Sequence, residues 1–182
     1  VAQLPDGRAI EAARILSDGT NENGNWSNAR MEAYAYQNSF NSPVVLGQVM
    51  TANDADWSTF WCSDGNGNNP PSASSCYVGK QVAEDSDATR ADETLGVIVV
   101  EGGSGSIEGI AYQFGLGGDT IEGYGDTPAY EYALSGFSTT PEIGIATMAA
   151  MDGGNGGWAV LYGNSPLSVD AIGLAIDEDQ IK

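Results

Sequence analysis

The chain has 182 residues, with 25 Asp and Glu against 6 Lys and Arg, a net charge of −19 and no His. Such a negative surface repels phosphate backbones and argues against a nucleic-acid-binding protein. The absence of His excludes Ser-His-Asp and Cys-His nucleophiles and His-ligated zinc, so we expect no enzyme. No apolar run reaches the roughly 20 residues of a membrane helix. An acidic, Gly-rich composition favours a secreted or cell-surface protein that does not insert into membranes.

In chain order, the sequence predicts short strands rich in β-branched and aromatic residues, separated by Gly, Asn, Asp, Ser and Pro. Helix propensity competes with strand propensity only at "AIEAARIL". We assign this segment as a strand because its later counterpart "SIEGIAYQF" favours a strand. This spacing is typical of antiparallel β-sandwiches, so the expected fold class is all-β. The predicted strands lie near residues 9–16, 31–37, 43–51, 56–62, 76–84, 94–101, 107–114, 128–134, 141–149, 157–163 and 169–177.

The chain also resembles itself at a spacing of nearly one hundred positions. Five matches occur in the same order, and "EGGSGS" at the point between the two series has the composition of a short linker. We therefore predict two tandem homologous β-sandwich halves, residues 1–102 and 103–182. The matched segments are 9–15 with 106–112, 33–40 with 130–137, 42–50 with 140–148, Trp57 with Trp158, and 78–85 with 172–179.

The second half lacks a counterpart of the strand "ADETLGVIVVE" at residues 91–101. We expect the resulting gap beside the strand near residues 169–177 to be filled by a segment from elsewhere, because exposed sheet edges favour association. Three sources are open: the N-terminal "VAQLP", a strand donated by another chain, or a longer precursor.

The two cysteines, Cys62 and Cys76, flank "SDGNGNNPPSASS", which has neither strand nor helix character. A pair that brackets such a loop predicts a disulfide and an oxidising compartment. The alternative is two free thiols on neighbouring strands.

Acidic residues gather in loops and at strand ends. Oxygen-rich, Gly-containing loops suit calcium, which takes 6–8 oxygen ligands, although solvated acidic loops are the alternative. The candidate calcium ligands are Asp54, Asp56, Glu84, Asp85, Asp152, Asn155, Asp177 and Asp179.

Trp57 and Trp158 begin their predicted strands beside these loops, where an indole face can stack on a sugar ring. Asp54 and Asp152 would then bond sugar hydroxyls, giving two equivalent sites and avidity for a repetitive glycan. The alternative is that both tryptophans belong to the core.

The phrases "FNSPVVLGQVMT" and "FSTTPEIGIATMAAM", with the Trp strand downstream, resemble the H-type lectin-like β-sandwich. "YVGKQVAEDSDATRADETLGVIVVE" and "MDGGNGGWAVLYG…LAIDEDQI" resemble a duplicated module of secreted proteins from marine microbes. The resemblance implies six antiparallel strands and binding of galactose or N-acetylgalactosamine. We thus expect an extracellular carbohydrate-binding or adhesive module, calcium-stabilised, whose partner is a glycan. The alternative is a structural subunit of an extracellular filament, sheath or surface layer that binds copies of itself by strand donation.

Overall fold

The computed structural model describes residues 2–125, 130–151 and 153–178. These ranges contain thirteen strands, no α-helix and one 3-10 turn, η1 (Asn28–Arg30), which confirms the all-β prediction. The strands are β1 (Ala2–Gln3), β2 (Ala9–Ser17), β3 (Thr20–Asn21), β4 (Glu32–Ala35), β5 (Pro43–Val49), β6 (Thr59–Ser63), β7 (Ser75–Gln81), β8 (Glu93–Glu101), β9 (Gly103–Ile107), β10 (Ile110–Phe114), β11 (Tyr130–Ala133), β12 (Trp158–Leu161) and β13 (Ala171–Asp177).

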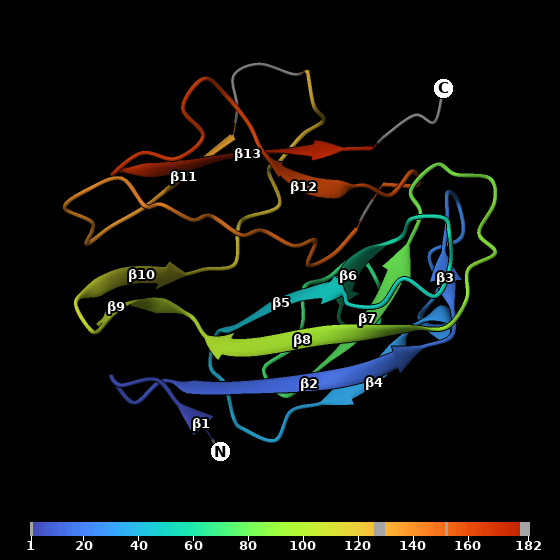
Figure 1. The fold of residues 1–182 in the computed structure, drawn as a ribbon, viewed down its shortest axis with the longest axis horizontal. Helices are drawn as coiled ribbons and strands as arrows, with labels where there is room; N and C mark the ends of the chain where they lie inside the picture. The colour runs from blue at the N-terminus through green and yellow to red at the C-terminus, as the bar shows by residue number, and fades with distance from the viewer. Residues whose placement is uncertain (1, 126–129, 152, 179–182) are drawn as a thin grey trace.

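The N-terminal strands form two facing sheets (Figure 1). One sheet has the order β1-β2-β8-β5, so β8 lies between β2 and β5 and pairs with both in antiparallel fashion. The other sheet centres on β7, which pairs with β6 along one edge and with β4 and β3 along the other. The short β3–β7 pair is parallel, and the other pairs are antiparallel.

The main core lies between these two sheets and follows from the alternation of side chains along each strand. On β8, Leu95, Val97 and Val99 face inward and are buried, whereas Ile98 between them is exposed. Burying such a side chain contributes roughly 1.5–3 kcal/mol, which explains why the most β-prone segment is the central strand. The buried members of the core cluster are Phe40, Val45, Phe60, Cys62, Cys76, Val78, Leu95, Val97 and Val99.

A smaller cluster covers the outer face of the β7 sheet. Trp61 is fully buried there with Met31 and Met151, and Trp26 packs edge to face against Trp61 with ring centroids 5.5 Å apart. The Trp26 indole N–H donates to the Gly154 carbonyl at 2.7 Å. Residues far apart in the sequence thus tie the C-terminal region to the outer face of the sandwich.

The C-terminal strands form a hairpin, β9–β10, and a three-stranded sheet with the order β11-β13-β12. This sheet repeats the arrangement β4-β7-β6, with the last strand in the centre in both. The register agrees with the sequence match, because Phe60 lies opposite Lys80 on β6–β7 and Leu161 lies opposite Leu174 on β12–β13. The structure does not show two tandem sandwiches, however, since the described part of residues 103–182 forms no second pair of facing sheets.

Three local predictions are wrong, each for a physical reason. The predicted linker is strand β9, because Glu108 and Gly109 take positive φ angles of 52° and 85° and close a tight hairpin onto β10. Residues 141–149 form no strand, because no neighbouring strand offers them a ladder, and only Met148 makes a bridge, to Trp61. No gap lies beside β13, because β11 and β12 occupy its two edges.

Within the described ranges, no helix is long and apolar enough to span a membrane.

Candidate functional site

The two predicted sugar-stacking tryptophans lie together rather than in two separate sites. Trp57, in the loop before β6, meets Trp158, the first residue of β12, edge to face with ring centroids 5.3 Å apart and planes at 74°. Trp57 is 37% exposed, and Trp158 is half-buried. The expectation of two equivalent sites is therefore wrong, because the contact joins both rings into one aromatic pair.

Arg90 holds the loop that carries Trp57. Its side chain is only 1% exposed, and its Nε donates to the Trp57 carbonyl at 2.8 Å. Its Nη2 pairs with the Asp85 carboxylate at 2.9 Å, and its Nη1 donates to the carbonyls of Asp87 and Thr89. A buried guanidinium with its donors satisfied in this way fixes the loop conformation on which the position of Trp57 depends.

Two carboxylates complete the support of this loop. Asp54 accepts from the backbone N–H of Asp56 and of Ala91, and these hydrogen bonds hold its pKa below the usual range. Buried Glu93 accepts from the backbone N–H of Asn53 and Asp54 and from the hydroxyl of Thr51. Burial raises the pKa of Glu93, but these hydrogen bonds outweigh burial and leave it lowered.

The predicted calcium ligands do not gather into one cluster in the described part of the chain. No group of three or more Asp, Glu or Cys suited to a metal ion occurs among the residues that the structure describes. Asp54 and Asp85 are committed to backbone N–H groups and to Arg90, and Asp177 lies opposite Trp158 across the β12–β13 ladder. Asp152 and Asp179 lie outside the described residues, so calcium binding stays a prediction. The remaining candidates are exposed Asp56 and half-buried Glu84 and Asn155.

The cysteines lie close together but are not bonded. Cys62 on β6 and Cys76 on β7 are free and buried in the main core, which matches the alternative of thiols on neighbouring strands and not the predicted disulfide. The reason is the register: Cys62 lies opposite Val78, so Cys76 is its diagonal neighbour on the same face. Burial raises the pKa of Cys76 to about 11 and also raises that of Cys62.

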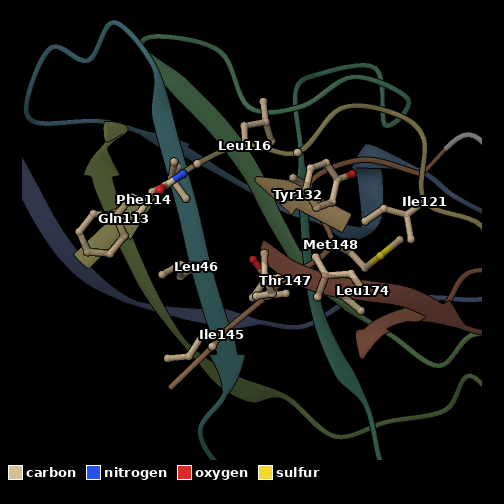
Figure 2. A pocket seen from close by; sticks show the side chains of 18 of the residues that line it. Leu46, Gln113, Phe114, Leu116, Ile121, Tyr132, Ile145, Thr147, Met148 and Leu174 are labelled. Atoms are coloured by element: carbon tan, nitrogen blue, oxygen red, sulfur yellow. The ribbon is translucent and has the colours of Figure 1, made fainter. Parts of the chain in front are cut away.

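The described part of the chain contains an apolar groove of about 1370 Å³. Its walls come from β5, from β10 and the residues that follow it, and from residues 143–147, while β11 and β13 contribute Tyr132 and Leu174. Figure 2 shows Phe114, Leu116, Leu46, Ile145 and Leu174 around it. The groove exceeds the roughly 300–1,000 Å³ of small-molecule pockets, so its size suits a polypeptide segment better.

Apolar side chains in this groove are exposed. Ile143 and Ile145 are 76% and 67% exposed, and Ile110 at the start of β10 is 74% exposed. Between the two isoleucines, a Cβ on Gly144 would lie 3.0 Å from Leu167 and 3.2 Å from Ile172, so the backbone of Gly144 packs directly against the β13 region. Gly144 therefore packs closely against its neighbours, while the flanking isoleucines stay largely exposed.

Two segments that line the groove have few strand partners among the described residues. The structure gives β10 one strand partner, β9, and places Ile143 and Ile145 in no strand. The Thr147 hydroxyl donates to the Val45 carbonyl at 2.9 Å, which fixes one end of residues 143–147 against β5. Strand β10 and residues 143–147 thus line the same apolar groove.

Sequence reasoning missed Arg90 and the groove. Arg90 stands alone among acids in "EDSDATRADE", and a single basic residue in such a run is a signal for a buried ion pair. The groove had a signal too: the alternating isoleucines of "EIGIATM" have the period of a strand, although they join no sheet in the structure.

Comparison with protein-family models, with curated proteins and with solved structures found no match to this chain. The resemblance to the H-type lectin-like module therefore stays a prediction.

Proposed function

We propose that this protein is an extracellular assembly module that accepts an extended polypeptide segment as an added strand in the apolar groove. The observation that carries the proposal is the exposure of Ile143 and Ile145 in the same groove as β10, whose one partner among the described strands is β9. A strand placed there would bury these side chains and pair backbone groups at the same time, as in β-augmentation. This proposal keeps the strand addition of the filament, sheath or surface-layer alternative without requiring that the strand come from another copy of the chain, and the groove favours it over glycan binding as the principal role.

The chain contains a template for the added strand. In the N-terminal sandwich, β8 lies between β2 and β5 and pairs with both. The sequence matches make the β9–β10 region the counterpart of β2, and residues 140–148 the counterpart of the segment around β5. No described strand lies between these counterparts. The correspondence supports a duplicated ancestry and an added strand of the β8 type.

A direct test uses a labelled peptide with the sequence Thr94–Val100 and measures its binding to the full chain by fluorescence anisotropy. We expect saturable binding that is lost in the double variant Ile143→Asp/Ile145→Asp. The matched control is Leu16→Asp, because Leu16 is also an exposed apolar residue but does not line the groove. Thermal unfolding checks that all three proteins are folded. Absence of binding, or equal binding by the double variant, would contradict the proposal.

A second candidate function is carbohydrate binding at the aromatic pair. Trp57 keeps more than a third of its surface exposed, and Arg90 fixes its backbone. An indole that is exposed and held in position suits stacking on a sugar ring, because little freedom is lost on binding. The pair would form one sugar site at the junction of β6 and β12.

The test is a glycan array with the wild-type chain and with Trp57→Ala, each with and without EDTA. Binding that requires Trp57 supports the sugar site, and EDTA sensitivity supports the predicted calcium. Tyr124→Ala is the matched control, because Tyr124 is an exposed aromatic residue outside the pair. A wild-type chain that binds no glycan in either condition would contradict this candidate.

A further inference from the structure

We infer that the segment accepted by the apolar groove belongs to a different polypeptide and carries Lys or Arg on both sides of an apolar strand. The inference rests on the proposed function and adds the chemistry of the partner. It follows from the charges around the groove, from the charges of the chain as a whole, and from the shape of the space to be filled.

Among the residues that the structure describes, the charged residues that line the groove are all acidic. They are Asp119, Glu122, Glu142 and Glu178, and the described lining includes no Lys or Arg. Lys182 is the one basic residue that follows Arg90 in the sequence, so positive charge is scarce throughout the C-terminal region. Like charges across an interface are unfavourable, and opposite charges steer association. Lys or Arg on both sides of the incoming strand would therefore interact favourably with these acidic residues.

A second copy of the chain is a poor occupant. Each copy carries a net charge of −19, so two copies repel each other. Most basic side chains in the described part of a copy are also committed: Arg8, Arg30 and Arg90 are in ion pairs, and Lys80 is fully buried. Lys182 lies outside the described residues. Arg14 on β2 is exposed, but its strand is held in the N-terminal sheet by the antiparallel ladder to β8 from Ile10 to Ser17.

The apolar part of the partner should follow the β8 pattern. On β8, Leu95, Val97 and Val99 point to one side and fill the core, at alternate positions. The groove is likewise lined by apolar side chains, among them Leu174 and Ile172 from β13. An extended segment with apolar residues at alternate positions would place one face on these side chains and leave the other toward solvent.

The experiment compares four labelled peptides. Three contain the native sequence of Thr94–Val100, flanked on both sides by paired lysines, paired serines or paired glutamates. The fourth contains the same seven residues in scrambled order, flanked by paired lysines. Affinities for the full chain are measured by anisotropy at low and at high salt. We expect the native-order lysine peptide to bind at least about tenfold more tightly than the glutamate peptide at low salt. This difference in affinity should be smaller at about 0.5 M NaCl than at about 0.05 M NaCl, because salt screens the acidic residues that line the groove. The scrambled peptide should bind much more weakly.

The other possible results of this experiment would overturn the inference about charge, the proposed function, or both. Equal binding of the lysine, serine and glutamate peptides would overturn the inference about charge and leave the proposed function standing. Absence of binding by every native-order peptide would overturn both. Equal binding of the scrambled lysine peptide would show attraction by charge alone and would also overturn both. Self-association of the chain in sedimentation, abolished by Ile143→Asp/Ile145→Asp, would replace the foreign partner by a second copy.

Discussion

The indole rings of Trp57 and Trp158 meet edge to face, with centroids 5.3 Å apart. These residues are counterparts in the sequence match, yet they lie in one contact that joins the loop before β6 to the first residue of β12. The pair therefore links the N-terminal sandwich to the C-terminal sheet, whatever it binds.

This link should be measurable as a coupling energy. Edge-to-face aromatic pairs contribute about 1 kcal/mol beyond the area they bury. We expect a double-mutant cycle of Trp57→Ala and Trp158→Ala, followed by urea unfolding, to give a favourable coupling of about that size. Strictly additive effects of the two substitutions would show that the contact contributes nothing to stability.

Arg90 should matter more to stability than any other basic residue on the described loops. Replacing it by Met leaves Asp85 without its ion-pair partner and removes the donors to three carbonyls. Removing one member of a buried ion pair costs roughly 3–5 kcal/mol, and the partial exposure of Asp85 places the expected loss at about 3 kcal/mol. The control Arg14→Met changes an exposed arginine and should alter the free energy of unfolding by less than about 0.5 kcal/mol. Equal effects of the two substitutions would contradict the structural role of Arg90.

The buried thiols give a prediction with a definite sign. Burial raises the pKa of Cys76 from 9.0 to about 11, so the unfolded thiol loses its proton before the folded one does. The stabilisation is fully present below pH 9 and is lost as the pH rises through about 11, because the unfolded state binds fewer protons in that window. The pKa of Cys62 is also raised, and that of Tyr34 is raised to about 12, so all three act in the same direction.

We expect the free energy of unfolding to fall between pH 9 and pH 11, and to fall less steeply in a Cys62→Ala/Cys76→Ala variant. In the native protein at pH 8, both thiols should react with Ellman's reagent only after denaturation. Rapid reaction of two thiols in the native state, or no thiol signal in the denatured, unreduced protein, would contradict the buried free thiols.

Strand positions could be predicted from the sequence where a strand buries the side chains on one of its two faces. The β-branched residues of "TLGVIVV" predicted β8, and the match of "AIEAARI" to "SIEGIAY" correctly favoured a strand over a helix for β2. Such segments carry their structure in a period of two residues, which is local information.

The other features of the fold and of the candidate site depend on which distant segments pack against one another. Local sequence patterns do not contain that information. Ile143 and Ile145 have the pattern of a strand, but no ladder partner is present, so the pattern does not become a strand. The contact of Trp57 with Trp158 and the hydrogen bond from Arg90 to the Trp57 carbonyl each join residues that only the assembled fold brings together. The groove arises in the same way, from β5, β10 and β13 at once.

The most direct test of the central claim is hydrogen–deuterium exchange of the full chain with and without the lysine-flanked peptide of the Thr94–Val100 sequence. An added strand in the groove should slow exchange of the backbone amides of residues 110–114 and 143–147, because these amides gain hydrogen bonds and lose solvent. Amides of β1 at the far sheet edge serve as the internal control and should not change. Protection confined to residues 110–114 and 143–147 is the predicted result. Protection at β1, or unchanged exchange throughout at saturating peptide, would contradict the account.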